Sequence, residues 1–243
     1  MRLLASPDMR LFSSFFILAS ASLCLFAQAV RKPVFVSPEQ LPVASVLANP
    51  PNDAQTAAEL AGLHEIEQTR TPAQIAHAKA DDAEEDIFIF KNVMGDKFTA
   101  EALPLTALLS THVHGDEGLI VNPAKKFFHR LRPYHFDSSL KPVCKTNPDS
   151  TDYGYPSGHS VTGYLEALVL TMMVPEKRDA ILARADDYAH SRVVCGVHYP
   201  SDVVASKSVA YAMIGIIMNN PQFQKELESA KAEIHRALMT PRP

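Results

Sequence analysis

Three short segments of the sequence combine cationic, imidazole and carboxylate side chains at spacings that suit the handling of a small anion. The first segment runs from Lys125 to Pro133 and places Lys125 and Arg132 seven residues apart. On one helix these two side chains would share a face, about 10 Å apart along the axis, so both could reach one anion. Taken alone, the segment is typical of a solvated basic stripe, and Lys126 and Arg130 are expected to be surface charges.

The second segment, Tyr155-Pro156-Ser157-Gly158-His159, falls where a helix is expected to begin. The first amides of a helix are unpaired and lie at the positive end of its dipole, so a helix start is suited to anion binding. Ser157 would add a hydroxyl donor, Gly158 would let the anion approach the backbone, and His159 would face it. The alternative is an ordinary turn in which Ser157 only caps the helix.

The third segment runs from Ser191 to Asp202 and contains Arg192, whose planar guanidinium suits phosphate oxygens. Ser201 is expected to cap the next helix, which would put Asp202 in its first turn, close to His198. A carboxylate bonded to one imidazole nitrogen fixes the tautomer and leaves the lone pair of the other nitrogen free to attack. The alternative is a structural Asp–His pair.

The elements that would position these side chains are helices, because the alternating patterns typical of strands are scarce. Thr71-Pro72 indicates the start of a helix towards Phe90, and Thr99 is expected to cap the next one. Asn122-Pro123 would open or restart another helix, which Pro133 must stop. The predicted fold class is all-α, a single compact multi-helix domain. Further helices are expected near 157–174, 176–190 and 201–219, with a last one opened by Asn220-Pro221.

The first 29 residues are expected to be a signal peptide that is cleaved. A basic start precedes an apolar run from Leu11 to Phe26, and Ala27-Gln28-Ala29 fits a cleavage site. The run is shorter than the ~20 residues a membrane span needs, and no later apolar stretch reaches that length, so no span is expected after cleavage. Residues 30–54 are rich in proline and are predicted to form an extended arm, followed by a helical domain over 55–243.

Composition excludes some classes of protein. A hydrophobic fraction of 47% over 243 residues excludes wholesale disorder, and a net charge of −4 argues against a general nucleic-acid binder. Cleavage would leave Cys144 and Cys195, an even count that suggests one disulfide in an oxidising compartment, with two buried free thiols as the alternative.

Two further segments carry charged or metal-ligating residue types without a predicted site. His112-Val-His114-Gly-Asp116-Glu117 looks like a metal cluster, but two histidines two apart on a helix point about 200° apart, so no metal site is predicted there. The acidic run from Asp81 to Asp86 is expected to be a solvated helix face.

In order, the patterns Lys-x6-Arg-Pro, Pro-Ser-Gly-His and Ser-Arg-x5-His-x3-Asp closely resemble the motif of the type 2 phosphatidic acid phosphatase superfamily. Within that superfamily the chain resembles the class A bacterial non-specific acid phosphatases over about residues 45–240, including its leader, its size, Ser-Arg-Val-Val-Cys-Gly-Val-His and the closing helix 220–233. It departs from that class at Tyr153-Gly154-Tyr155 and Ser160, where Gly-Ser-Tyr and Thr are usual, which affects the shape of the pocket. The implied fold is that of the acid phosphatases and vanadium-dependent haloperoxidases.

The resemblance implies a secreted acid phosphatase that hydrolyses phosphate monoesters through a phosphohistidine, with no metal and no cofactor. His198 would be the nucleophile, Asp202 would orient it, and His159 would protonate the leaving alcohol and then take a proton from water. An acidic optimum is expected, since His159 must start protonated while His198 needs a bare nitrogen. The phosphoryl oxygens would be bound by Lys125, Arg132, Ser157, Gly158 and Arg192.

Expected substrates are small nucleotide, sugar or aryl phosphates, with vanadate as an inhibitor and with phosphate transfer to alcohols as a further reaction. The expected location is the periplasm or the exterior, and a homodimer is one option for the assembly. One alternative is a vanadate-dependent haloperoxidase, which uses the same anion cradle but is generally much longer. A membrane-embedded lipid phosphatase is disfavoured by the missing spans, and a non-catalytic phosphate-binding protein by the presence of both histidines and Asp202.

Overall fold

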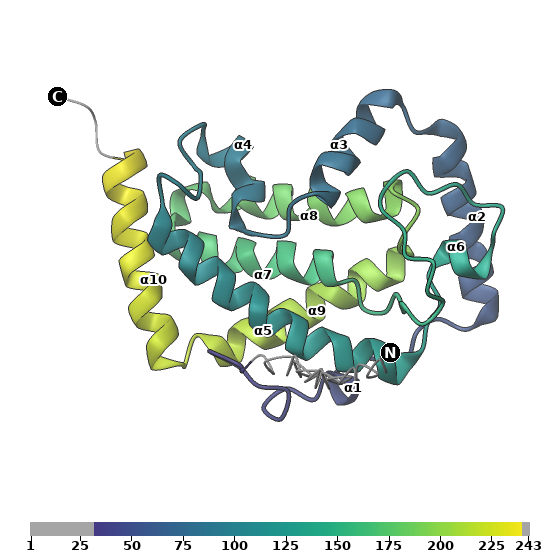
Figure 1. Cartoon of the computed structure of the whole chain (residues 1–243), viewed down its shortest axis with the longest axis horizontal. Helices are drawn as coiled ribbons and strands as arrows, with labels where there is room; N and C mark the ends of the chain where they lie inside the picture. The colour runs from purple at the N-terminus through teal and green to yellow at the C-terminus, as the bar shows by residue number, and fades with distance from the viewer. Residues whose placement is uncertain (1–31, 240–243) are drawn as a thin grey trace, which may run out of the picture. The chain divides into compact units, whose positions relative to one another are not determined.

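Helix α7 (Gly158–Met173) forms the centre of the fold. Eleven of its sixteen residues are buried, as expected for a helix with protein on most sides. It packs against α5 (Pro104–Phe128), α8 (Arg178–Val194) and α9 (Pro200–Ile217), and Figure 1 shows it lying among them. The helix that begins at the Pro-Ser-Gly-His turn is therefore a core helix with three helical neighbours.

The structure is a computed structural model that describes residues 32–239, and every regular element in this range is helical, which confirms the all-α prediction. The helices expected near 157–174, 176–190 and 201–219 are present with small shifts at their ends. The expected signal peptide, residues 1–29, lies outside the described range. The remaining elements are α1 (Val43–Val46), α2 (Asp53–Thr69), α3 (Pro72–Asp82), α4 (Lys91–Met94), α6 (Pro133–Phe136), α10 (Pro221–Ile234), the 3₁₀ turns Ile87–Phe90 and Pro175–Lys177, and a π-helical turn, His235–Met239.

Helix α3 begins as predicted but ends early. The Thr71 hydroxyl accepts the amide of Gln74, whose side chain accepts the Thr71 amide, so the expected cap is a full capping box. The helix stops at Asp82, and Ile87–Phe90 forms a separate 3₁₀ turn with all four side chains buried. Four consecutive apolar residues cover all sides of a helical turn, so they need a segment enclosed by neighbours and not the end of a surface helix. The prediction of one helix to Phe90 was wrong.

Helix α5 is longer than predicted. It begins at Pro104 and not directly after Thr99, and it continues through Pro123. Pro123 lies on the exposed side of the helix, where water can bond to the carbonyl that proline leaves unpaired. The helix ends at Phe128, five residues before Pro133, and its cap residue His129 adopts a left-handed φ of 50°.

The segment predicted as an extended arm contains the short helix α1 and is anchored to α5 by Asp116. Oδ1 of Asp116 accepts the amide of Val34 at 2.8 Å, and Oδ2 accepts the amides of Phe35 at 2.6 Å and Val36 at 2.9 Å. Phe35 and Val36 are themselves buried in the main core. A carboxylate that accepts three backbone amides thus replaces a regular secondary-structure ladder for this stretch of chain.

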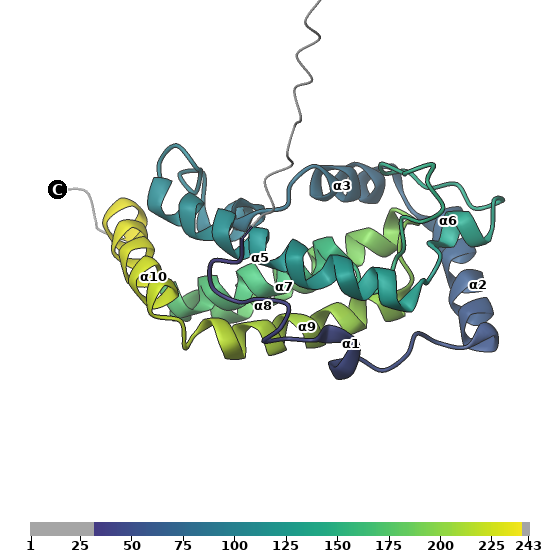
Figure 2. The ribbon, with the colours of Figure 1, turned by 60° about the horizontal axis from the view of Figure 1, so that its bottom comes forward.

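Helices α9 and α10 meet at Asn220, whose side chain caps α10 by accepting the amides of Gln222 and Phe223, as the Asn-Pro pair predicted. Helix α10 packs against α5 and α7 (Figure 2). Within residues 32–239 no single helix is both long and apolar enough to cross a membrane, and α9 meets that criterion only together with Pro221–Leu238, across a bend of 100°.

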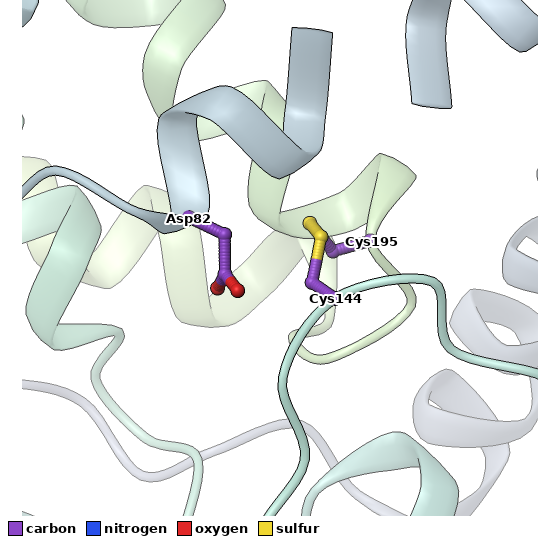
Figure 3. A group of neighbouring side chains, drawn as sticks. All are labelled: Asp82, Cys144 and Cys195. Atoms are coloured by element: carbon purple, nitrogen blue, oxygen red, sulfur yellow. A yellow bond between two sulfur atoms is a disulfide. The ribbon is translucent and has the colours of Figure 1, made fainter. Parts of the chain in front are cut away.

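The structure joins Cys144 and Cys195 in a disulfide, with Cα atoms 5.2 Å apart. The bridge ties the loop after α6 to the end of α8, and Figure 3 shows it beside Asp82, the last residue of α3. Asp82 and the two sulfurs lie within 4.8 Å of one another. Because the sulfurs are bonded to each other, this group offers a metal no thiolate.

Candidate active site

His198 and Asp202 form a buried pair at the start of α9. Asp202 lies in the first turn, where its Oδ2 lies 3.1 Å from His198 Nδ1 and accepts the amide of Tyr199 at 3.0 Å. The position of Asp202 in the first turn is as predicted, but the residue before the helix is Tyr199 and not Ser201. Pro200 opens the helix, because its fixed φ suits the first helical position.

Arg132 fixes the tautomer of His198. Its Nη1 lies 2.8 Å from His198 Nε2 and 3.2 Å from the carbonyl oxygen of Val197. A guanidinium can only donate, so Nε2 must accept, and the ring proton must lie on Nδ1, where it is donated to Asp202. The lone pair of Nε2 therefore points towards the cationic side chain that the sequence assigned to phosphate binding.

The electrostatic environment keeps His198 uncharged. Burial lowers its pKa well below the ordinary value, and the nearby charges of Arg132 and Lys125 lower it further. Burial also raises the pKa of Asp202 to about 6, although the neighbouring Arg130 acts in the opposite direction. A neutral imidazole with a fixed tautomer is the form that can attack an electrophile.

Arg130 is buried, so its assignment as a surface charge was wrong. Its Nη1 donates to Asp202 Oδ1 at 2.5 Å and to Ser201 Oγ at 2.6 Å, and its Nη2 donates to Glu59 Oε2 at 2.8 Å. The guanidinium also lies over the ring of Tyr199, 4.1 Å from its centre. Sequence reasoning missed this residue because its partners come from α2 and α9, about 70 residues away on either side.

Lys125 and Arg132 do not share a helix face as predicted. Lys125 lies in the last turn of α5, whereas Arg132 follows the left-handed residue His129 and precedes α6. The turn redirects the chain, so the two side chains approach the site from different elements. Arg132 remains close enough to Lys125 for its charge to lower the pKa of that lysine, after the larger effect of burial.

The start of α7 has the predicted cap and lies beside Lys125. The fully buried Ser157 precedes the helix, and its Oγ lies 3.0 Å from the Ser160 hydroxyl. A Cβ added at Gly158 would come within 3.3 Å of Glu117 Oε1 and 3.8 Å of Lys125 Nζ. The missing side chain at Gly158 therefore leaves space beside the first amides of α7. The Glu117 carboxyl and the Lys125 ammonium border this space.

Glu117 is a second residue that the sequence did not assign to the site. It is 4% exposed, and its Oε1 has no hydrogen-bond partner among the residues that the structure describes. Burial raises its pKa to about 8, although the charge of Lys125 acts in the opposite direction. The position of Glu117 within the His112–Glu117 cluster was its only sequence signal.

The side chains of Arg132, His159 and Arg192 line one pocket of about 500 Å³. Three elements bring them together: the turn before α6, the start of α7 and the end of α8. Ser157 and Gly158 lie at the start of α7, and His198 contacts the pocket through its bond to Arg132. Three of the predicted site residues thus share one hollow, whereas Lys125, Ser157, Gly158, His198 and Asp202 are not among the residues that line it.

Each of these three pocket side chains contacts a carboxylate. Arg192 Nη1 donates to Asp82 Oδ1 at 2.5 Å, Arg132 Nε pairs with Asp152 Oδ2 at 2.8 Å, and His159 Nδ1 pairs with Glu85 Oε1. Burial lowers the pKa of His159 below its ordinary value, with Glu85 acting in the opposite direction.

The acidic run from Asp81 to Asp86 is therefore not the solvated helix face that was predicted. Asp81 is buried and paired with Arg184, while Asp82 and Glu85 line the pocket. Charge alone suggested solvent exposure, and the partners on α7 and α8 could not be seen from the local sequence.

Gly154 lies against the His198–Asp202 pair. A Cβ at this position would come within 3.2 Å of Asp202 Oδ2 and 3.7 Å of His198 Nδ1. Its amide donates to the carbonyl of Arg130 at 2.8 Å. The departure from the usual motif at 153–155 therefore falls directly beside this pair, where a glycine allows the loop to approach it closely.

The histidines of the metal-like segment on α5 have separate partners. His112 Nδ1 lies 2.9 Å from Glu226 Oε2 on α10, and His114 Nδ1 lies 3.3 Å from Thr162 Oγ1 on α7. Asp116 binds the arm. The segment divides its side chains among three neighbours, because residues two apart on a helix point in different directions.

Comparison with known proteins identifies the family of this chain. The model of the PAP2 superfamily matches residues 104–226, just over half of the chain. The chain is 37% identical over 148 residues to a non-specific acid phosphatase of Providencia stuartii, covering 59% of each protein, and 33% identical over 152 residues to one of Salmonella typhi, covering 60% of each. The chain thus spans less than two thirds of the length of these curated relatives.

A solved structure shares the fold. The transmembrane PAP2 type phosphatidylglycerolphosphate phosphatase from Bacillus subtilis superposes with a TM-score of 0.51 at 19% identity, over 74% of this chain and 90% of that one. The matched region of the family model contains all the predicted site residues, from Lys125 to Asp202. The chain belongs to the PAP2 superfamily.

Proposed function

We propose that this protein is an acid phosphatase that hydrolyses phosphate monoesters through a phosphohistidine on His198. The observation that carries the proposal is the hydrogen bond from Arg132 to His198 Nε2, which connects the unprotonated nitrogen of His198 to a cation that lines the pocket. The acid phosphatases among the relatives support the same reaction class. The proposal extends to export, with residues 1–29 as the signal peptide and 30–54 as an arm on the 55–243 domain.

In the first step, Arg132 Nη1 transfers its hydrogen bond from His198 Nε2 to a phosphoryl oxygen, and the freed lone pair of Nε2 attacks phosphorus while the bond from phosphorus to the ester oxygen breaks. Asp202 accepts the Nδ1 proton of the imidazole in a hydrogen bond and so stabilises the positive charge that develops on the ring. His159 donates its proton to the departing alkoxide. The products are the free alcohol and a phosphohistidine, with His159 left neutral.

In the second step, a water oxygen attacks phosphorus and displaces His198, while the neutral His159 takes a proton from the water. Inorganic phosphate is released and both histidines return to their starting states. An alcohol in place of water would give a new phosphate ester by the same step, so phosphate transfer belongs to the proposal. Charge on the phosphoryl oxygens is neutralised by Lys125, Arg132, Arg192, the Ser157 hydroxyl and the amide of Gly158.

The proposed mechanism needs a neutral His198 and a protonated His159, and a bound substrate would favour the protonated form of His159. The lowered pKa of His198 keeps its imidazole neutral, as a nucleophile must be. Burial also lowers the pKa of His159, so His159 is protonated only at acidic pH or when a phosphate dianion next to it favours the charged form. An acidic optimum follows from this requirement.

The first experiment measures phosphate release from aryl, sugar and nucleotide monophosphates at pH 5 and pH 7 with EDTA present. We expect turnover at pH 5, insensitivity to EDTA and inhibition by vanadate. Bromide oxidation by peroxide and vanadate, without phosphate release, would identify a haloperoxidase instead. Tight phosphate binding without turnover would identify a binding protein.

The second experiment replaces His198 by alanine. We expect His198→Ala to lose at least 1,000-fold in turnover while its circular dichroism and thermal unfolding remain native-like, because the nucleophile is absent. Quenching the wild-type protein with radiolabelled substrate in an alkaline denaturant should trap an alkali-stable, acid-labile label, and the variant should trap none. Near-normal turnover by His198→Ala would refute the mechanism.

A further inference from the structure

We infer that Asp82 and Glu85 make this pocket select phosphate monoesters by the charge of their alcohol, favouring cationic and neutral alcohols over alcohols that carry further anionic groups. The inference rests on the proposed function, because it concerns the same pocket. It assigns a role to two carboxylates that take no part in the proposed chemistry.

Asp82 is fixed in the pocket from two sides. Its Oδ1 accepts from Arg192 Nη1 at 2.5 Å and lies 4.0 Å from His159 Nε2, while its Oδ2 accepts the amide of Lys145 at 3.0 Å. The disulfide at Cys144 holds the Lys145 loop in place beside the end of α3 (Figure 3). Asp82 therefore cannot swing far from the pocket when its contact with Arg192 is lost.

Glu85 lies nearer to solvent. It pairs with His159 Nδ1, and its side chain is 38% exposed, whereas that of His159 is 21% exposed. His159 is the group that must face the ester oxygen in the proposed first step. The alcohol attached to that oxygen must then lie beside Glu85 and Asp82.

Binding of a substrate exposes these charges. Phosphoryl oxygens that bind Arg192 and Arg132 would accept the guanidinium hydrogen bonds that Asp82 and Asp152 now accept. The carboxylates would remain in the pocket with less compensation, facing the alcohol. They would repel a second anionic group on the substrate and attract an ammonium group.

The other charges around the pocket do not cancel this field. Lys145 also lines the pocket, but its side chain is exposed, and a mobile surface ammonium is strongly screened by solvent. Asp152 adds a third negative charge to the lining. Burial opposes the ionisation of Asp82 and Glu85, but hydrogen bonds from Lys145 and Arg192 to Asp82 and from His159 to Glu85 lower the pKa of both carboxyls, so both are charged at weakly acidic pH.

The test compares three small esters of similar size: ethanolamine phosphate, 2-hydroxyethyl phosphate and phosphoglycolate. Their alcohols are cationic, neutral and anionic. We expect the kcat/KM of the wild-type protein to be highest for the cationic ester and lowest for the anionic ester, with each value normalised to that of the neutral ester. The ratio between the cationic and the anionic ester should fall at least tenfold in the Asp82→Asn/Glu85→Gln double variant, which removes two charges without changing the size of the side chains.

Glu84→Gln provides the matched control. Glu84 belongs to the same acidic run and is exposed, and its side chain does not line the pocket. Removing its charge should leave the ratio within about twofold of the wild-type value. An equal fall in Glu84→Gln and in the double variant would show a general surface effect and overturn the inference.

A salt series on the wild-type protein gives a second measurement that needs no variant. Raising the salt from 0.05 to 1 M shortens the Debye length to about 3 Å, so the ratio should fall towards that of the double variant. The inference would be overturned if 2-hydroxyethyl phosphate is hydrolysed but the ratio between the cationic and the anionic ester is unchanged both by salt and by the single variants Asp82→Asn and Glu85→Gln. Failure to hydrolyse any of the three esters would instead count against the proposed function.

Discussion

Arg130 and Asp202 form a buried ion pair that stands behind the candidate nucleophile. Arg130 Nη1 lies 2.5 Å from Asp202 Oδ1, while the other oxygen of the same carboxylate lies 3.1 Å from His198 Nδ1. Arg130 does not line the pocket, and its side chain contacts the His198–Asp202 pair through Asp202. The orientation of the imidazole thus depends on a cation from the turn after α5.

The Arg130–Asp202 pair predicts a loss of turnover without a loss of substrate affinity. Arg130→Lys keeps a positive charge but cannot donate to Asp202, Ser201 and Glu59 with the same planar geometry. We expect kcat to fall at least tenfold and KM to change less than threefold in steady-state phosphate release. Arg130→Met should also lower the free energy of unfolding by about 3–5 kcal/mol, because it removes the guanidinium that pairs with the buried Asp202 carboxylate. An unchanged kcat in Arg130→Lys would contradict the positioning role.

The neutral state of His198 predicts the acidic limb of the pH profile. Burial and the charges of Arg132 and Lys125 hold the pKa of His198 well below 6.5, so the nucleophile stays unprotonated, and kcat/KM persists, well below pH 6.5. Removing one cation in Arg132→Gln should raise that pKa and move the acidic limb to higher pH, in addition to raising KM. The exposed Lys126→Gln serves as the control and should leave the limb in place. An acidic limb at the same pH in Arg132→Gln would show that a different group sets it.

Substitution of Gly163 is expected to cause a packing defect at the centre of the fold. A Cβ at this position of α7 would come within 2.5 Å of Cδ1 of the fully buried Tyr188, whose hydroxyl bonds to the carbonyl of Glu84. We expect Gly163→Ala to destabilise the protein by about 1–3 kcal/mol in urea unfolding. Gly62→Ala in α2, where a Cβ would meet nothing within 4 Å, should instead stabilise it by about 0.5–1 kcal/mol. Equal effects of the two changes would rule out a steric cause.

Asp116 predicts how the arm is held. Asp116→Ala removes the acceptor of three backbone amides, at Val34, Phe35 and Val36, and should release this segment from α5. We expect hydrogen exchange of these amides to accelerate at least 100-fold, with a fall of about 2–4 kcal/mol in the free energy of unfolding. The exposed Glu228→Gln should change neither quantity. Unchanged exchange in Asp116→Ala would mean that apolar packing of the arm is sufficient.

The sequence by itself determined the elements whose ends have local causes. Thr71, Asn220 and the Pro-Ser-Gly turn at 156–158 each place a side chain that can bond to amides two or three residues ahead, so these helix starts were predictable from neighbouring residues alone. The motif residues were predictable for a related reason. Anion chemistry needs particular side chains at fixed spacings, and those spacings are visible in the chain.

Only the tertiary structure decided which charges are buried and what they contact. Arg130 and Asp82 look like surface residues in their local sequence, yet their partners Asp202 and Arg192 lie 72 and 110 residues away. Lys125 and Arg132 do not share the expected helix face, because α5 ends before Arg132 and the chain turns at His129, which has a left-handed φ of 50°. A charge is buried only when the fold supplies a partner, and that partner is chosen by three-dimensional packing and not by proximity along the chain.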